Sequence, residues 1–176
     1  MRDILVIMGS PRAGGTTNAL TDAFIKGAEE AGHRVTKFSL GQCKVNGCLG
    51  CNGCMRTGTC VQDDDMTREI YPKLLECDTV VMASPIYCYM CTALLKCFVE
   101  RTYPMSMQPA SRTRKDAVLL MTAMAGGSVF KPTVEWHRAN IGYIGWRDRG
   151  MVLAGGCGST VPGRYLEEAY NLGKKL

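Results

Sequence analysis

Four closely spaced cysteines are the residues of this chain best suited to hold a metal: Cys48, Cys51, Cys54 and Cys60. The first three follow a C-x2-C-x2-C spacing that is used to ligate iron–sulfur clusters, and the glycines between them let the chain wrap around such a group. Zinc sites more often use two separated C-x2-C pairs. The pattern therefore predicts either a [4Fe-4S] site or a cysteine-rich structural loop, and Cys43 lies close enough to replace one ligand.

A second chemical motif is the segment 9–18, Gly-Ser-Pro-Arg-Ala-Gly-Gly-Thr-Thr-Asn, which directly follows the apolar run Ile4–Met8. Hydroxyls, a guanidinium and free backbone amides at the start of a helix favour an anion. The segment nearly fits a P-loop, but Gly15 occupies the lysine position, and the chain has no G-x-G-x-x-G fingerprint. We therefore expect a terminal monophosphate rather than a triphosphate.

The elements that position these motifs alternate between apolar strands and helices. Five strands and five helices predict an α/β fold, a doubly wound parallel sheet, in a single domain over 1–176 with a cysteine-rich insertion at about 43–60. Such sheets bind ligands beyond the carboxyl ends of their strands. The expected strands are Ile4–Met8, Arg34–Leu40, Thr79–Ala83, Ala117–Thr122 and Gly150–Ala154, and the expected helices run from Thr16 or Thr17 to Ala31, from Asp64 or Asp65 to Glu76, and over Cys91–Arg101, Thr133–Tyr143 and Gly163–Leu172.

At these residues the chain resembles a known family. The pattern G-S-P-R-x-x-G-x-T-x-x-L over residues 9–20 is similar to the phosphate loop of the NAD(P)H-dependent FMN reductase and iron-sulfur flavoprotein group. The likeness continues through 48–60, Ser84–Tyr87 and Glu168–Leu176, so it covers nearly the whole chain. It implies a flavodoxin-like sheet with strand order 2-1-3-4-5, helices on both faces and bound flavin mononucleotide (FMN).

The resemblance also implies which residues face the flavin. A proline-started loop with two tyrosines and a methionine can supply a flat apolar wall and backbone donors for the ring. The alternative is that Tyr87 and Tyr89 pack in the core or at a subunit contact. No side chain need act as an acid or base, so no catalytic residue is predicted. The phosphate would lie against Ser10, Arg12, Gly15, Thr16, Thr17 and Asn18, one side of the ring against Pro85, Ile86, Tyr87, Cys88, Tyr89 and Met90, and the other side near the loop Ala123–Gly127, with Ala125 and Gly126 at its centre.

The leading interpretation is an oxidoreductase that passes electrons from NAD(P)H through FMN to a quinone, a free flavin or another acceptor. The alternative is an iron-sulfur flavoprotein that relays electrons between protein partners through FMN and a [4Fe-4S] cluster. Electron-carrier flavodoxins are usually acidic, so the net charge of +5 argues against a pure carrier. A third class, a zinc-stabilised binding module without flavin, would make the phosphate motif a coincidence. Because members of the family usually dimerise, we expect a homodimer or a higher homo-oligomer.

Composition and charge limit the other functions. The densest basic group, Arg112, Arg114 and Lys115, is expected in a solvated loop and is too small to indicate nucleic acid. The run Asp63–Asp65 predicts a helix cap rather than a metal site. The apolar run Ile4–Met8 is too short for a signal peptide or a membrane span. We therefore expect a cytoplasmic protein with no membrane partner, whose ten cysteines lie in a reducing compartment.

Overall fold

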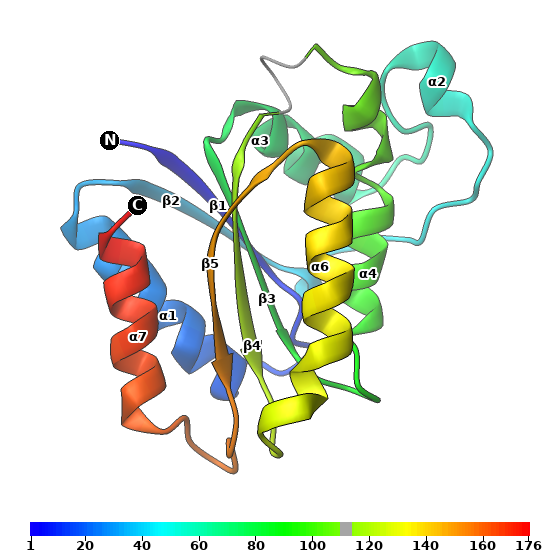
Figure 1. Ribbon diagram of the computed structural model, residues 1–176. Helices are drawn as coiled ribbons and strands as arrows, with labels where there is room; N and C mark the ends of the chain where they lie inside the picture. The colour runs from blue at the N-terminus through cyan, green and yellow to red at the C-terminus, as the bar shows by residue number, and fades with distance from the viewer. Residues whose placement is uncertain (110–113) are drawn as a thin grey trace.

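The computed structural model describes residues 1–109 and 114–176, which form a five-stranded parallel sheet with helices on both faces (Figure 1). The strand order is β2-β1-β3-β4-β5, and every neighbouring pair is parallel. The predicted flavodoxin-like fold is therefore confirmed. The strands are β1 (Asp3–Met8), β2 (Arg34–Ser39), β3 (Thr79–Pro85), β4 (Asp116–Thr122) and β5 (Arg147–Ala154).

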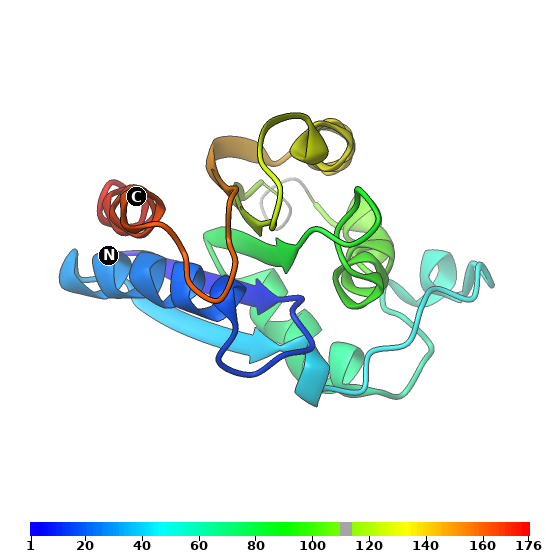
Figure 2. The same ribbon diagram turned by 90° about the horizontal axis from the view of Figure 1, so that it is seen from below.

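The helices form two layers that enclose separate cores. The layer on one face consists of α1 (Thr16–Glu30) and α7 (Gly163–Lys174), and the layer on the other consists of α3 (Tyr71–Glu76), α4 (Ala93–Glu100) and α6 (Lys131–Ile144) (Figures 1 and 2). Successive side chains of a strand point to opposite faces. In β1, Ile4 and Val6 therefore pack with α1 and α7, whereas Leu5 and Ile7 pack beneath the other layer. None of the helices in the described ranges is long and apolar enough to cross a membrane.

Two glycines allow α1 and α7 to lie in close contact. A Cβ atom at Gly27 would overlap the backbone carbonyl of Tyr170, and one at Gly173 would overlap the backbone carbonyl of Phe24. The helices can therefore lie this close only because each contributes a glycine where it meets the backbone of the other. This contact fixes α1, and with it the loop that precedes the helix, against the sheet.

The cysteine-rich segment and the helix after it differ in detail from the expectation. A short helix, α2 (Gly53–Thr57), lies within the segment, and no apolar periodicity predicts it. The helix expected to end at Glu76 begins with a π-helical turn, η2 (Met66–Ile70), which continues directly into α3. The remaining short elements are 3-10 turns, η1 (Leu40–Gln42), η3 (Tyr103–Met107) and η4 (Gly127–Phe130).

The basic group before β4 is only partly a solvated loop. Lys115 is buried, and its ammonium donates to the carbonyl oxygens of Cys77 at 2.6 Å and Leu75 at 3.1 Å. The expectation of a solvated side chain is therefore wrong for Lys115. Arg114 is exposed, as expected, and Arg112 lies outside the described residues.

Candidate functional site

A cleft of about 380 Å³ opens at the carboxyl end of the sheet, where the loops after β1, β3, β4 and β5 converge. Figure 2 shows the sheet from the side of these loops. This is the edge at which doubly wound sheets bind their ligands. The residues that line the cleft are Ser10, Arg12, Gly15, Thr16, Thr17, Pro85, Ile86, Tyr87, Thr122, Ala123, Met124, Cys157, Gly158 and Ser159.

The loop between β1 and α1 presents hydrogen-bond donors to the cleft. Gly15 precedes the helix without a side chain to cap it, and no acidic side chain stands in the first turn, so the opening amides remain available. Gly14 has a φ of +72°, which favours glycine. Ser10 Oγ shapes the loop by accepting the Arg12 amide at 3.2 Å. The buried Oδ1 of Asn18 has no partner within the described residues, and a side-chain amide can present either an acceptor or a donor there.

A hydrogen bond between two buried hydroxyls ties this loop to the sheet. Thr17 Oγ1 lies 2.7 Å from Thr122 Oγ1, and the two residues are 2% and 1% exposed. The backbone of Thr122 also accepts the amide of Ile86 at 2.8 Å. Three walls of the cleft therefore meet at the end of β4.

The loop after β3 turns back as a tight hairpin. Tyr87 and Met90 exchange two backbone hydrogen bonds of 2.8 and 3.0 Å. The two residues between them, Cys88 and Tyr89, have φ values of +49° and +64°, in the left-handed region that non-glycine residues rarely adopt. Backbone strain of this kind concentrates at ligand sites and turns. The hairpin directs Tyr87 toward the cleft and leaves Tyr89 65% exposed, outside the lining of the cleft.

A further wall is built by the loops after β4 and β5. The amide of Ala123 donates to Ala154 at 2.9 Å, and the amide of Cys157 donates back to Ala123 at 2.9 Å. These two bonds bring segment 157–159 beside Met124, which is 83% exposed. The wall thus combines small residues with one flexible apolar side chain.

The predicted flavin residues are only partly brought together. Segment 157–159 and the end of β4 were missed, although the hydroxyls of Thr122 and Ser159 at strand ends were a usable signal. Asn18 lines a smaller hollow behind the phosphate loop. The predicted residues that line the cleft are Ser10, Arg12, Gly15, Thr16, Thr17, Pro85, Ile86, Tyr87, Ala123 and Met124, and those outside its lining are Asn18, Cys88, Tyr89, Met90, Ala125, Gly126 and Gly127.

The four cysteines of the predicted metal site do not form a closed ligand set in the described residues. Burial raises the pKa of the Cys54 thiol, and negative charge at Cys60, Cys48 and Cys51 adds to the increase. Cys48 and Cys51 are exposed, and all ten cysteines are free thiols. Across residues 1–109 and 114–176, no three Cys, His, Asp or Glu side chains are grouped closely enough to hold a metal ion. The iron–sulfur site therefore stays a prediction.

The cysteine segment and the cleft lie in different parts of the folded molecule. Both ribbon views place α2 beyond α4, away from the loops that follow β1, β3, β4 and β5 (Figures 1 and 2). The two sites therefore do not share a wall within one chain.

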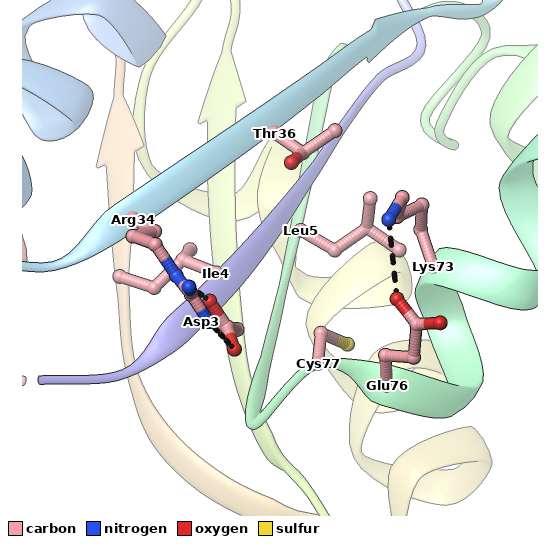
Figure 3. Close-up of a pocket in the computed structure, with 8 residues that line it drawn as sticks. All are labelled: Asp3, Ile4, Leu5, Arg34, Thr36, Lys73, Glu76 and Cys77. Carbon is pink, nitrogen blue, oxygen red and sulfur yellow. Dashed lines mark hydrogen bonds and ion pairs between the residues drawn. The ribbon is translucent and has the colours of Figure 1, made fainter.

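A second pocket of about 370 Å³ lies at the opposite edge of the sheet, between the starts of β1 and β2 and the end of α3 (Figure 3). Its charged side chains pair with one another: Asp3 with Arg34 at 2.6 Å, and Lys73 with Glu76 at 3.1 Å. Because these charges are already neutralised, the pocket offers little to a charged ligand. We assign it no function.

Comparisons with known proteins identify the family of this chain. The family model of NADPH-dependent FMN reductase matches residues 2–148. An iron-sulfur flavoprotein of Archaeoglobus fulgidus is 32% identical over 177 residues, covering 97% of this chain and 76% of the relative. An iron-sulfur flavoprotein of Methanocaldococcus jannaschii is 28% identical over 183 residues, covering 98% of this chain and 94% of the relative.

Solved structures support the fold. An NAD(P)H:quinone oxidoreductase from Methanothermobacter marburgensis superposes with a TM-score of 0.76 at 19% identity, covering 99% of this chain and 96% of that chain. At that identity the likeness concerns the fold alone. The family match spans most of the sequence, and the Archaeoglobus relative aligns along nearly all of it. The chain therefore belongs to the NADPH-dependent FMN reductase family.

Proposed function

We propose that this FMN-dependent oxidoreductase holds its flavin in the cleft at the carboxyl end of the sheet, with the phosphate at the start of α1. One observation carries the proposal: the uncapped helix start and Arg12 open onto the same cleft as the apolar surfaces of Ile86 and Met124. Bound FMN supplies the redox chemistry, taking a hydride from NAD(P)H and passing electrons to a quinone, a free flavin or another acceptor.

The charges around the cleft suit a phosphate group. Arg12 is the charged side chain among the described residues that line it, and no carboxylate stands beside it. Backbone amides at a helix start and one guanidinium can together bind a monophosphate dianion. The Thr16 hydroxyl supplies a further donor at the same point.

The other walls suit an aromatic ring system. Pro85 and Ile86 offer apolar surface, and Tyr87 can stack or pack edge-on against a ring. Across the cleft, Ala123 and Gly158 are small enough to let a ring approach the backbone. These walls would exclude water from one side of the ring and leave the side toward the mouth accessible.

The mouth of the cleft is apolar and exposed, which supports a homodimer or a larger homo-oligomer. Tyr87 and Met124, which line the cleft, are 42% and 83% exposed, and Tyr89 in the adjoining hairpin is 65% exposed. Large apolar side chains that gather on a surface often mark a contact with another protein. Light scattering of the FMN-loaded protein would show a mass above one chain if a second copy covers this mouth, and a monomer would contradict it.

The site is tested by blocking it without disturbing the fold. Added Cβ atoms at Gly158 in the cleft and Gly142 on α6 would both meet open space. The Gly158→Trp variant should lose FMN binding and NADPH oxidation with quinone or free FMN as acceptor. The matched Gly142→Trp variant should keep both activities. Unchanged FMN binding in Gly158→Trp would contradict the location of the flavin.

The cysteine segment supports a second function. We propose that Cys48, Cys51, Cys54 and Cys60 hold a [4Fe-4S] cluster that lets the protein relay single electrons to a protein partner. The C-x2-C-x2-C spacing supports this proposal, as do the two relatives named as iron-sulfur flavoproteins. The free thiols of all ten cysteines are compatible with the reducing cytoplasm, where we place the protein.

Iron and acid-labile sulfide assays on anaerobically purified protein test the cluster. Cys54→Ser should remove iron and sulfide while FMN remains bound, because the segment lies away from the cleft. Cys88→Ser, which changes an exposed cysteine in the hairpin, is the matched control and should keep both. FMN-loaded wild-type protein that takes up no iron and sulfide would contradict the cluster and leave the flavin function standing.

A further inference from the structure

The hydrogen bond between Thr17 and Thr122 leaves one hydroxyl proton without an acceptor. Each threonine hydroxyl carries one proton and can accept two hydrogen bonds. The two oxygens lie 2.7 Å apart, so one proton lies between them, whichever residue donates it. Within the described residues, neither oxygen has a second hydrogen-bond partner. The other proton therefore needs an acceptor from outside these residues.

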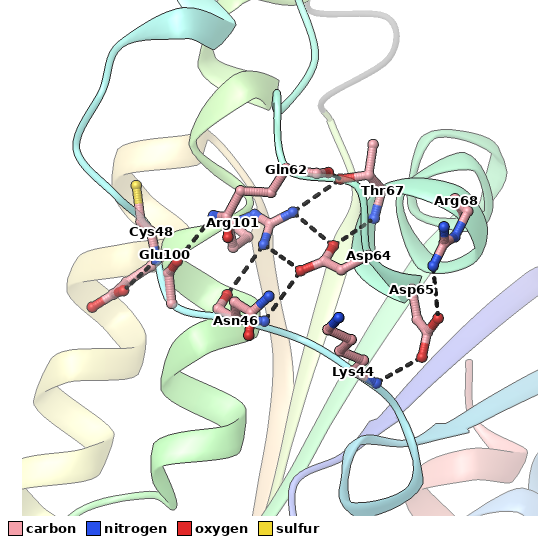
Figure 4. A network of polar contacts seen from close by, with 11 residues as sticks. Lys44, Asn46, Cys48, Gln62, Asp64, Asp65, Thr67, Arg68, Glu100 and Arg101 are labelled. Atoms are coloured by element: carbon pink, nitrogen blue, oxygen red, sulfur yellow. Dashed lines mark hydrogen bonds and ion pairs between the residues drawn. The ribbon is translucent and has the colours of Figure 1, made fainter.

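A complete hydrogen-bond chain elsewhere in the protein shows what this pair lacks. The hydroxyl of Thr67 accepts a hydrogen bond from Arg101 at 2.9 Å and donates its own proton to the carbonyl oxygen of Gln62 at 2.7 Å (Figure 4). There a donor, a hydroxyl and a final acceptor follow one another. In the pair of Thr17 and Thr122, the described part of the chain supplies no final acceptor.

The pair lies within the flavin cleft. Thr17 and Thr122 both line the cleft, and the two residues are 2% and 1% exposed. A buried donor without an acceptor costs about 1–3 kcal/mol, so such a group calls for an explanation. A ligand oxygen bound in the cleft would accept the remaining proton and remove this cost.

The backbone on both sides of the pair is held by further hydrogen bonds. The buried hydroxyl of Thr21 donates to the carbonyl oxygen of Thr17 at 2.7 Å. The carbonyl oxygen of Thr122 accepts the amide of Ile86 at 2.8 Å, and β4 is paired on both sides in the sheet. The two hydroxyl oxygens therefore meet in a fixed geometry, in which the protons can turn while the oxygens stay in place.

The strongest acceptor in the cleft decides the direction of the protons. A phosphate dianion accepts charge-assisted hydrogen bonds, which are about twice as strong as neutral ones. Thr17 stands in the first turn of α1, where the phosphate is proposed to bind, whereas Thr122 ends β4. The favoured direction with FMN bound therefore runs from Thr122 to Thr17 and from Thr17 to the phosphate. Each bond in such a chain strengthens the next.

The bond to Thr122 also selects the side-chain conformation of Thr17. In a helix, a threonine side chain divides between two χ1 rotamers, because its hydroxyl can also bond a backbone carbonyl of the preceding turn. A donor on β4 favours the rotamer in which the Thr17 oxygen faces the sheet at the cleft.

We propose that Thr122 is a positioning residue for the FMN phosphate: its hydroxyl donates to Thr17 and so holds the Thr17 hydroxyl ready to donate to a phosphate oxygen. Thr122 lies on β4, far along the chain from the phosphate motif at 9–18, and only the folded chain brings the two together. The inference rests on the flavin site proposed above. Only hydrogen bonds change in this step, and neither threonine gains or loses a proton.

Fluorescence titrations with FMN and with riboflavin, which lacks the phosphate, test the role of Thr122. Thr122→Val removes the hydroxyl and keeps the shape of the side chain. It should weaken FMN binding about three- to tenfold, because Thr17 keeps its own proton but loses its orientation and polarisation. Riboflavin binding should not change. Thr122→Ser keeps the hydroxyl and should restore the FMN affinity.

Two further variants separate this role from a general loss of stability. Thr17→Val should weaken FMN binding about 10–100-fold, the loss expected for a hydrogen bond to a charged group. Adding Thr122→Val to Thr17→Val should not lower the ratio of FMN to riboflavin affinity any further. Thr102→Val is the matched control, since it removes a buried hydroxyl that donates to the Val99 carbonyl at 2.8 Å, and it should leave the ratio unchanged.

The ratio of FMN to riboflavin affinity separates failure of this inference from failure of the flavin site. Equal losses of FMN and riboflavin affinity in Thr122→Val would show that the hydroxyl contacts another part of the flavin and would overturn the inference. A wild-type ratio in Thr122→Val would overturn it as well. Wild-type protein that binds FMN no more tightly than riboflavin would instead contradict the proposed phosphate position.

Discussion

Thr17 and Thr122 share a hydrogen bond of 2.7 Å between their hydroxyl groups, and both residues are almost completely buried. One stands in the first turn of α1 and the other ends β4, so the bond joins the phosphate loop to the wall behind the flavin cleft. Losing this bond costs more than losing an exposed one, because a buried hydroxyl without its partner cannot form a hydrogen bond with water instead.

The first prediction is a double-mutant cycle on this pair. Thr17→Val and Thr122→Val should each lower the free energy of unfolding of the flavin-free protein by about 1–3 kcal/mol, since each leaves one hydroxyl unpaired. The double variant should lose less than the sum of the two. Urea denaturation measures all four proteins, and simple additivity would show that the hydroxyls do not interact.

The second prediction concerns Arg12 and the flavin phosphate. Arg12→Ala should weaken FMN binding by about 10–100-fold, the loss expected for a hydrogen bond to a charged group. Binding of riboflavin, which lacks the phosphate, should not change. Fluorescence titrations with both flavins measure this, with Arg138→Ala on the exposed face of α6 as the control. Equal losses for FMN and riboflavin would place Arg12 at the ring instead.

The fold was predictable because its local signals agree with its long-range packing. Apolar runs such as Ile4–Met8, which form β-strands, are followed by glycine or proline turns. Helix α1 ends at Glu30, next to the predicted end at Ala31 and just before Gly32. The order of strands came from the family resemblance. The helix α2 was not predictable in this way, since it is short and is flanked by the left-handed residues Asn52 and Gly58 rather than by an apolar period.

The site was predictable where it follows a strand directly, and not where it depends on contacts between distant residues. The phosphate loop and Pro85–Tyr87 follow β1 and β3 and line the cleft as expected. Segment 157–159 reaches the cleft only because Cys157 bonds back to Ala123. Likewise the local sequence around Asp64 predicts a helix cap, and only the folded chain brings it to its buried partner Arg101, which directly follows α4.

The third prediction tests the close contact of α1 and α7. Gly173→Ala should destabilise the protein by about 1–3 kcal/mol or more, because its Cβ would overlap the backbone of α1. Gly163→Ala at the start of α7 has open space around the new Cβ and should be neutral or slightly stabilising. Thermal unfolding compares the two variants. Similar midpoints would mean that the helices can separate without cost.

The fourth prediction is a pH dependence set by His137. This residue is fully buried, both ring nitrogens lack partners within the described residues, and burial lowers its pKa from 6.5 to about 4. Between pH 6.5 and 4, His137 is therefore protonated in the unfolded chain and neutral in the folded chain. The free energy of unfolding decreases as the pH falls through this range. The loss is about 3 kcal/mol from this group.

Urea denaturation at several pH values between 7 and 4 measures this dependence. His137→Leu should flatten it in that window, whereas His33→Gln, at a position near the surface, should change it much less. A wild-type pH profile in His137→Leu would show that another group controls the acid sensitivity.

The most direct test of the account is an anaerobic titration of the FMN-loaded protein with NADPH, followed by its visible absorption. We predict one flavin per chain, bleaching of the flavin bands by NADPH, and recovery of the bands when a quinone is added. The Gly158→Trp variant should show neither bound flavin nor bleaching. Wild-type protein that binds no FMN, or whose bound FMN neither NADPH nor NADH bleaches, would contradict the proposed function.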